Sequence, residues 1–516
     1  MKVFLMHRDK DFDGEGAMPW NEHALVQDLE LNTLLRAMAG DDEYLFGITR
    51  KALLSGIQNG ADTILYRQAA LKDCLKNPAV VQELYNLMVD VLRATKKHWW
   101  GMSSHYPSSM LYSSVGLLES SLDTLRRLRT IAEEQAAIFE SEAFSGLFAM
   151  LRRELGEEYL GTIQQHLAGL KFRKGVLLSA ELGEYNEGTN YVLRQPLGKN
   201  ASWLQRILGK GPPTYNFRLA ERDTAGPRIL SDMQHRAISR VAIALARSSD
   251  HVMSFFKMLQ MELAFYVGGL NLYERLAAKE ERVCFPIPVS TGERRHRFSG
   301  LYDVCLSLRL ERKVVSNSGD ADGKSLLIVT GANQGGKSSF LRSIGLAQLM
   351  MQCGMFVGAD SFHAELCPSL FTQYRREEDT TMKSGKFDEE IARMSELVDH
   401  LVPNSMVLFN ESFAATNERE GSEIARQIVR ALLETRIKIF YVTHLYEFAH
   451  GFFDGKSESC IFWRAERRAD GTRTFRIVEG EPLETSYGED LYRQIFELDE
   501  QFENTQPSDT RSPIAS

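Results

Sequence analysis

Residues 326–339 read LLIVTGANQGGKSS, and this stretch decides the fold. The apolar run Leu326–Val329 contains β-branched residues and predicts a buried strand. Residues 331–338 fit the pattern GxxxxGK followed by Ser or Thr, and residues 340–350 read as a helix. A strand, a glycine-rich loop and a helix in this order predict a phosphate-binding loop.

The predicted loop supplies the groups that an anionic phosphate needs. Its glycines let backbone N–H groups turn toward the phosphates, and the following helix adds a favourable field at its N-terminus. Lys337 would reach the β- and γ-phosphates, and Ser338 would ligate Mg²⁺. The residues predicted to bind the nucleotide are Gly331, Ala332, Asn333, Gln334, Gly335, Gly336, Lys337, Ser338 and Ser339.

Two later apolar runs predict neighbouring strands. Met406–Phe409 leads into Asn410 and Glu411, and residues 437–442 lead toward His444. An acidic residue at such a strand end can bind the metal through water or orient an attacking water, although Glu411 would also be an ordinary strand-end residue. His444 can hydrogen-bond the γ-phosphate or the water, whereas a lone histidine is more often structural. Three strands separated by helices predict a parallel α/β sheet with its ligand at the carboxyl ends of the strands.

The composition fits a soluble intracellular protein. The chain has 516 residues, which suggests about two to four domains, and its net charge is −8. Without a strongly basic domain, contact with nucleic acid would have to come from local patches. The six cysteines form no CxxC pair, no apolar run is long enough to span a membrane, and the N-terminus does not read as a signal peptide. We therefore expect a cytoplasmic protein.

The region before the loop reads as helices interrupted by a small β-segment. Residues 176–195 predict a β-hairpin, and residues 215–219 predict a further strand. Pro227 opens a helical stretch to about Lys279 that is too long for one ordinary globular helix. We expect a lever-like helix with a break at Gly268-Gly269.

Two groups of basic residues are candidates for contact with DNA. Arg126, Arg127 and Arg129 lie largely off the apolar stripe of their helix, and they form either a solvated face or a phosphate-facing patch. The most basic neighbourhood surrounds the β-segment and contains Lys171, Arg173, Lys174, Lys199, Arg206 and Lys210. Within it, Lys199, Arg206 and Lys210 are the residues that we assign to DNA contact.

The motifs resemble those of the MutS family of DNA mismatch-repair ATPases, a branch of the ABC-type ATPases. Residues 330–339 (TGANQGGKSS) are similar to the family's TGPNMGGKST, and residues 406–421 (MVLFNESFAATNEREG) align without gaps on its LVLMDEIGRGTSTYDG. Residues 441–444 match its FATH, and residues 486–488 match its SYG. The resemblance implies ATP and Mg²⁺ as cofactors.

Two departures from the family bear on hydrolysis. The family's metal-binding aspartate is Asn410 here, whose carbonyl can hold a Mg²⁺-bound water but lacks the charge, and the implied metal site is Ser338 with Asn410. In the family, a signature serine closes over the nucleotide of the partner subunit. That position reads Gly385 here, after Ser384. A Ser384-Gly385 pair could still donate hydrogen bonds to a γ-phosphate in trans, so we expect ATP binding more firmly than fast turnover.

The implied fold class is multidomain, with an α-helical core and lever region that carries a small β insertion, followed by an α/β P-loop NTPase domain of the ABC type. We assign residues 1–115 to the helical core, 116–281 to lever helices with a clamp-like β-segment at about 170–225, and 282–503 to the ATPase domain. Residues 504–516 read as a disordered tail. Nothing in the chain resembles the family's N-terminal mismatch-reading or connector domains.

The implied function is an ATP-dependent switch on DNA, in mismatch repair or in recombination and DNA-structure recognition. Two identical chains would form a dimer with the nucleotides between them, Glu411 would orient water, and His444 would assist. DNA, duplex or branched, is the expected partner, and no membrane is. The alternative is a nucleotide-gated protein-interaction module with weak or no ATPase activity, because Asn410 lacks the charge.

Overall fold

The computed structural model describes residues 1–102, 106–172, 175–185, 187–194, 218–220, 222–376, 385–468 and 470–483. It contains two compact units. The helical unit comprises Met1–Leu5, Asp9–Phe12 and Asn77–Leu263, and the α/β unit comprises Met6–Arg8, Asp13–Lys76 and the described residues from Ala264 onward. The units cut across the boundaries predicted at 115 and 281, and the predicted tail lies outside the described residues.

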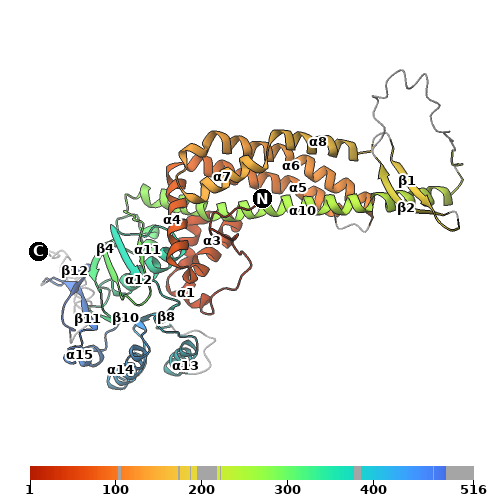
Figure 1. Ribbon diagram of the computed structural model, residues 1–516. Helices are drawn as coiled ribbons and strands as arrows, with labels where there is room; N and C mark the ends of the chain where they lie inside the picture. Colours follow the sequence, from red (N-terminus) through yellow and green to blue (C-terminus); the bar gives the residue numbers. More distant parts are fainter. Residues whose placement is uncertain are drawn as a thin grey trace, which may run out of the picture. The chain divides into compact units, whose positions relative to one another are not determined.

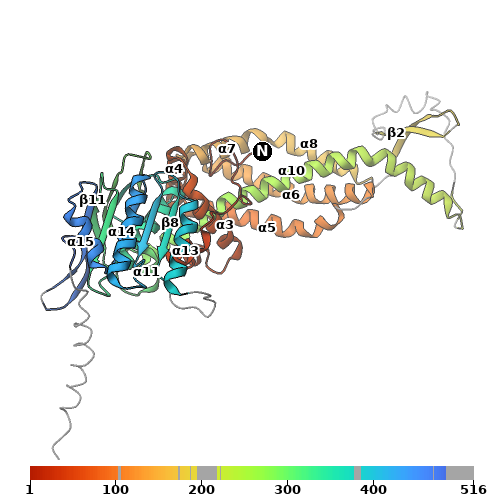
Figure 2. The ribbon, with the colours of Figure 1, turned by 90° about the horizontal axis from the view of Figure 1, so that it is seen from below.

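Long antiparallel helices make up most of the helical unit. They are α5 (Pro78–Met102), α6 (Pro107–Gln135), the 3-10 turn η2 (Ala136–Ile138), α7 (Glu142–Glu154), α8 (Glu157–Leu170) and the part of α10 up to Leu263. Figures 1 and 2 both show α5, α6 and α10 running side by side. Leu122, Leu125 and Leu128 recur at helical spacing and are buried, so the predicted apolar stripe faces the interior of the unit.

The predicted β-hairpin is confirmed. Strand β1 (Leu177–Leu182) pairs antiparallel with β2 (Gly188–Arg194), and the turn between them is closed by the N–H of Gly183, which donates to the carbonyl of Glu187 at 2.8 Å. Most of the further strand predicted at 215–219 lies outside the described residues.

Helix α10 (Ala225–Ala278) is one uninterrupted helix, and the predicted break at Gly268-Gly269 is wrong. A Cβ atom at Gly268 would lie 2.5 Å from Thr49 Cγ2, and one at Gly269 would lie 2.9 Å from Leu71 Cδ1. The two glycines therefore let neighbouring helices approach the backbone closely, and they do not interrupt its hydrogen bonds. Thr49 belongs to α3 (Glu43–Ser55) and Leu71 to α4 (Ala61–Lys76).

The α/β unit is built on a six-stranded sheet. Its order is β12-β11-β6-β10-β9-β8. The strands are β6 (Leu326–Gly331), β8 (Leu370–Tyr374), β9 (Met406–Asn410), β10 (Lys438–Val442), β11 (Cys460–Arg467) and β12 (Arg473–Glu479). The predicted parallel pairing is confirmed for β6, β9 and β10. Strands β8 and β11 also pair in parallel, and the edge strand β12 is antiparallel. Their near-continuous burial explains the apolar runs in the sequence.

Helices cover both faces of this sheet. Helix α12 (Lys337–Cys353) lies on one face, and α13 (Lys386–Asp399), α14 (Glu418–Glu434) and α15 (Tyr446–Asp454) lie on the other (Figure 1). A second sheet has the strand order β3-β7-β4-β5. Its strands are β3 (Ile287–Val289), β4 (His296–Leu301), β5 (Asn317–Asp320) and β7 (Ser361–Glu365).

Four short elements lie in the same unit with α3 and α4. They are α1 (Glu22–Asp28), α2 (Leu31–Ala39), the 3-10 turn η1 (Gly56–Gln58) and α11 (Val304–Arg309). Helix α12 is almost wholly buried because it packs between the sheet and helices α3 and α4. Within the described residues, no helix is both long and apolar enough to cross a bilayer.

Candidate functional site

The glycine-rich loop between β6 and α12 has a backbone that only glycine tolerates at several points. Gly331 and Gly336 have φ values of 108° and 89°. A Cβ atom at Gly335 would lie 2.7 Å from the Cβ atom of Ala465 on the neighbouring strand β11. The loop therefore turns sharply against β11, and α12 begins directly after it at Lys337. This places the N-terminus of α12, with its free N–H groups, at the end of the strand.

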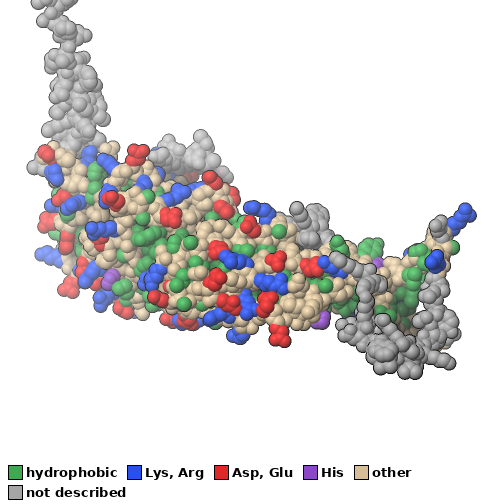
Figure 3. All heavy atoms as spheres, turned by 90° about the horizontal axis from the view of Figure 1, so that it is seen from above, with side chains coloured by type: hydrophobic (Ala, Val, Ile, Leu, Met, Phe, Trp, Pro, Cys, Tyr) green, Lys and Arg blue, Asp and Glu red, His purple; other side chains and the backbone are tan. Residues whose placement is uncertain are grey.

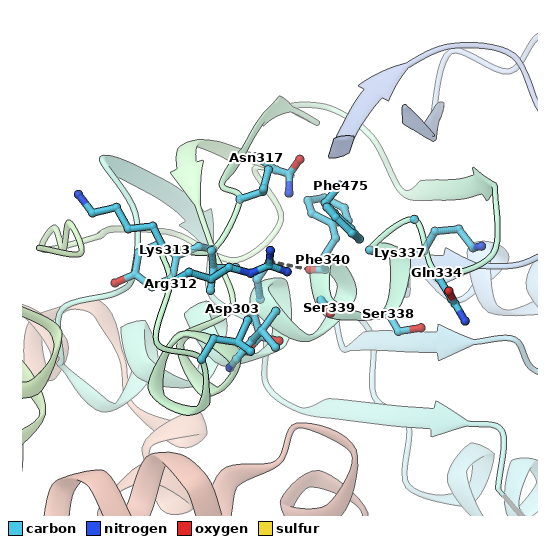
Figure 4. A pocket seen from close by; sticks show the side chains of 18 of the residues that line it. Asp303, Arg312, Lys313, Asn317, Gln334, Lys337, Ser338, Ser339, Phe340 and Phe475 are labelled. Carbon is cyan, nitrogen blue, oxygen red and sulfur yellow. Dashed lines mark hydrogen bonds between the residues drawn. The ribbon is translucent and has the colours of Figure 1, made fainter. Parts of the chain in front are cut away.

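A cavity of about 460 Å³ opens beside this loop. One wall is the loop and the first turn of α12, and another is the chain after α11, where Val314 and Val315 line the cavity. Figure 4 shows Phe475 of β12 beside the start of α12, with Arg312 and Lys313 across the cavity. The cavity thus has an apolar and aromatic side and a cationic side, in addition to the loop.

Lys337 is buried and points back into the loop. Its Nζ atom donates to the carbonyl oxygens of Gly331 at 2.9 Å and Ala332 at 3.1 Å. Burial lowers the pKa of Lys337, and the carboxylate of Glu411 partly opposes this effect. The ammonium group is therefore held among the backbone oxygens of the loop, next to the cavity.

Two of the predicted site residues meet at the ends of neighbouring elements. The hydroxyl of Ser338, in the first turn of α12, donates to Oδ1 of Asn410 at 3.0 Å. Asn410 is the last residue of β9, and it lies opposite Val442 of β10 and Tyr374 of β8 in the register of the sheet. These three strands therefore end at the same level, beside the loop.

The next two polar residues along this edge form a pair. Nδ1 of His444 lies 3.7 Å from Oε2 of Glu411, and both side chains are about one-third exposed. The nearby imidazole of His444 lowers the pKa of Glu411, and the positive charges of Lys337 and Arg375 add to this, although partial burial acts in the opposite direction. Glu411 is therefore an ionised carboxylate at neutral pH. Its backbone has a φ of 53°, in the left-handed region that costs a non-glycine residue energy.

The oxygen atoms of Ser338 and Asn410 fit a magnesium ion in type, because Mg²⁺ prefers oxygen ligands and commonly takes only one or two from the protein. Neither oxygen carries a charge. In the part of the chain that the structure describes, no cluster of three or more His, Cys, Asp or Glu side chains is arranged to hold a metal. A magnesium ion here would complete its coordination with water and with oxygens of a bound molecule, such as phosphate oxygens.

The structure brings most of the predicted site residues together and leaves others aside. The loop residues 331–339, Asn410, Glu411 and His444 all lie at one edge of the sheet. Gly385 is the residue before α13 and does not line the cavity. Ser384, Lys199, Arg206 and Lys210 lie outside the described residues.

Sequence reasoning missed two residues near the site. Phe475 lines the cavity from the edge strand, and its φ of 59° is unusual for an aromatic residue. Arg375 follows β8, and its N–H donates to the carbonyl of Asn410 at 3.0 Å. The aromatic side chain of Phe475, which comes after the parallel strand β11, was a weak sequence indication of a residue near the site. No sequence pattern indicated Arg375.

Comparison with known proteins divides the chain into two matched regions. Residues 59–279 match the family model described as MutS2 N-terminal domain, and residues 327–496 match the model described as MutS domain V. The second match contains the loop and the polar residues of the sheet edge.

Individual relatives match the chain over a limited length. MutS protein homolog 4 of Mus musculus is 28% identical over 151 residues, which are 29% of this chain and 16% of that protein. The DNA mismatch repair protein MutS of Clostridium kluyveri is 27% identical over 192 residues, 36% of this chain and 22% of that protein. The protein of the same name from Porphyromonas gingivalis is 34% identical over 131 residues, 25% of this chain and 15% of that protein. The matched stretch is thus less than a quarter of the length of each relative.

Proposed function

Because the chain belongs to the MutS family, we propose that its cavity binds ATP with Mg²⁺, that the ATP is hydrolysed slowly, and that the nucleotide changes how the chain holds DNA. One observation carries the proposal. The glycine-rich loop, the Ser338–Asn410 contact and the Glu411–His444 pair meet at one edge of a parallel sheet, beside a cavity of about 460 Å³. This volume is in the range of ligand pockets, roughly 300–1,000 Å³.

The loop would hold the phosphates. Backbone N–H groups of residues 333–338 and the N-terminus of α12 favour an anion at this position. Lys337 is close enough to exchange its bonds with the carbonyls of Gly331 and Ala332 for phosphate oxygens. The side chains of Val314, Val315 and Phe475 would then take the base, because a flat ring stacks well on apolar and aromatic side chains.

Ser338 and Asn410 would hold the magnesium ion. Bound there, Mg²⁺ neutralises charge on the phosphates and orients them. Asn410 offers a neutral carbonyl oxygen in place of a carboxylate, so the metal would be held more weakly than by an aspartate.

Glu411 is the residue that we assign to orienting the attacking water. Its carboxylate stays ionised because the nearby imidazole of His444 and the charges of Lys337 and Arg375 lower its pKa. An ionised carboxylate can accept a hydrogen bond from water and turn the oxygen lone pair toward the γ-phosphate. His444 would fix the carboxylate in place, and as an imidazolium it would also donate toward the phosphate from its other nitrogen.

The remaining parts of the proposal concern the assembly and DNA. Two identical chains would place Ser384 and Gly385 of one protomer over the nucleotide of the other, in an ABC-type arrangement. The loss of the γ-phosphate would then open the dimer and alter its hold on DNA. Lys199, Arg206 and Lys210 stay our candidates for DNA contact near the hairpin. Relatives described as DNA mismatch repair proteins support a role in repair or recombination.

A second candidate is a nucleotide-gated protein-interaction module without useful ATPase activity. The uncharged oxygen of Asn410 favours it, because a weakly held metal slows phosphoryl transfer without preventing nucleotide binding. Under this alternative, ATP binding persists while phosphate release and DNA binding are absent.

The proposal can be tested by titrating the purified chain with a fluorescent ATP analogue in the presence of Mg²⁺. Lys337→Ala should weaken binding at least tenfold, which corresponds to about 1.4 kcal/mol. Lys324→Ala is the matched control, because Lys324 precedes β6 at the opposite end of that strand and bonds the carbonyl of Glu458. Glu411→Gln should keep binding and lose phosphate release. Equal binding by the Lys337→Ala variant and the wild type would refute the site.

A further inference from the structure

Three arginines form a stripe along the N-terminal half of α10. Arg236, Arg240 and Arg247 are exposed and lie within the helical unit. With 3.6 residues per turn, their directions around the helix axis differ by no more than about 40°. The stripe is about 16 Å long at 1.5 Å per residue.

Among the residues that the structure describes, these guanidinium groups have no ion-pair partner. The structure gives none of the three an ion pair or side-chain hydrogen bond with any residue it describes. Unpaired arginines can place their full set of donors on a phosphate without first breaking a protein contact.

The arginines of α6 provide the contrast. Arg126 contacts Asp123 and Glu157, Arg127 pairs with Glu83, and Arg129 pairs with Glu133 and lies 3.8 Å from Glu157. Their charges are therefore largely neutralised by α5, α6 and α8 of the same unit. The sequence left two interpretations of this group open, a phosphate-facing patch or a solvated face. These ion pairs favour the solvated face.

The surroundings of the α10 stripe leave it the most cationic part of its helix. Asp232 and Asp250 are the acidic residues that flank it on α10, and both lie about 40° to one side of Arg236. His251 extends the stripe by one turn on the other side. On the face of the molecule drawn in Figure 3, acidic and basic side chains of the described residues are interspersed. A contact with a polyanion would therefore have to come from a local stripe and not from a broad basic surface.

We infer that this face of α10, defined by Arg236, Arg240 and Arg247, binds the phosphate backbone of duplex DNA. Phosphates recur about every 3.4 Å along each strand of the duplex, so a straight row of about 16 Å meets several of them. The contact reads no sequence, because phosphates are the same at every base pair. The inference rests on the DNA-binding part of the proposed function and assigns to it a surface distinct from Lys199, Arg206 and Lys210.

The test is the salt dependence of binding of the full chain to a labelled 30-base-pair duplex, followed by fluorescence anisotropy. Three neutralised phosphates contribute about −2.7 to the slope of log K against log salt concentration. The triple variant Arg236→Ala, Arg240→Ala, Arg247→Ala should lose this contribution and bind on the order of a hundredfold more weakly at 0.15 M salt. Replacing the same three residues by lysine should retain most of the slope.

The matched control is the triple variant Arg126→Ala, Arg127→Ala, Arg129→Ala, which removes the same formal charge from paired arginines of the same unit. Its slope should stay at the wild-type value. Circular dichroism melting checks that each variant is folded, and exposed substitutions on α10 should change stability by no more than about 0.5 kcal/mol.

Three results would overturn the inference. The α10 variant could keep the wild-type slope, the two triple variants could lose slope equally, or labelled polyglutamate could bind with the same dependence on the three arginines, which would reassign the face to an acidic protein. If the wild-type chain binds no duplex at all, the DNA-binding part of the proposed function fails together with this inference. Binding of the ATP analogue, measured without DNA, reports separately on the nucleotide site.

Discussion

Replacing Asn410 by aspartate changes the charge at the proposed metal site by one unit. Oδ1 of Asn410 lies 3.0 Å from the hydroxyl of Ser338, so a carboxylate there would face the same ion as that hydroxyl. A unit charge about 4 Å from a divalent cation gains several kcal/mol at an effective dielectric constant near 20. Desolvation and repulsion from Glu411 offset part of this gain, and charged contacts typically keep a net value of about 1.5–3 kcal/mol. We therefore expect half-saturation at an Mg²⁺ concentration lower by about ten- to a hundredfold.

The assay is a titration of Mg²⁺ at a fixed concentration of fluorescent ATP analogue, paired with measurement of phosphate release. Asn410→Asp should lower the midpoint and raise the turnover rate. Asn410→Ala removes the oxygen altogether and should raise the midpoint. If both variants keep the wild-type midpoint within twofold, Asn410 does not lie at the metal, and the reasoning from its contact with Ser338 is wrong.

Two further predictions concern stability. His296 is fully buried, and burial together with the charge of Lys438 lowers its pKa well below the ordinary value, so protonation favours the unfolded chain. The free energy of unfolding should not depend on His296 above about pH 6.5 and should fall by up to about 1.4 kcal/mol per pH unit below it. Denaturant melts at about pH 7.5 and 5.5 measure this slope, and His296→Phe should lose it. Gly268→Ala should destabilise the chain, because its Cβ atom would meet Thr49 at 2.5 Å, while Gly47→Ala, in open space on α3, should stabilise it by about 0.5–1 kcal/mol in the same melts. A stabilising Gly268→Ala would mean that the close helix approach does not hold in solution.

Much of the sheet could be predicted from the sequence because its strands are buried on both faces. Leu326–Val329, Met406–Phe409 and residues 437–442 are almost wholly apolar, which is the pattern of strands covered on both faces. Parallel strands have their carboxyl ends at one edge, so the meeting of Asn410 with the glycine-rich loop followed from the order of the motifs. The roles assigned to these residues stay predictions.

Other features depended on contacts between segments far apart in the sequence. Gly268 and Gly269 resemble a helix break when read locally, but their function is the close approach of Thr49 and Leu71. Phe475 reaches the cavity only because β12 folds back antiparallel beside β11.

The pairing of basic residues was equally invisible in the sequence. Arg127 is neutralised by Glu83, which is 44 positions earlier in the chain and on another helix. Arg236 and Arg240 on α10 have no such partner among the described residues. The local sequence therefore does not distinguish the arginines of α6 from those of α10. Only the packing of the helices shows which of them have acidic partners.

The charge balance of this end of the sheet depends on Asn410 and Arg375. Where the family has an aspartate, Asn410 is neutral, and Arg375 follows the neighbouring strand with its N–H bonded to the carbonyl of Asn410. The positive charge of Arg375 adds to the effect of the nearby His444 in lowering the pKa of Glu411. Relative to an edge with an aspartate, this edge has lost a negative charge beside the proposed metal and has an arginine on the next strand. Such an edge attracts the nucleotide's own negative charge more strongly and the metal more weakly, which explains in physical terms why we expect firm ATP binding and slow turnover from the same site.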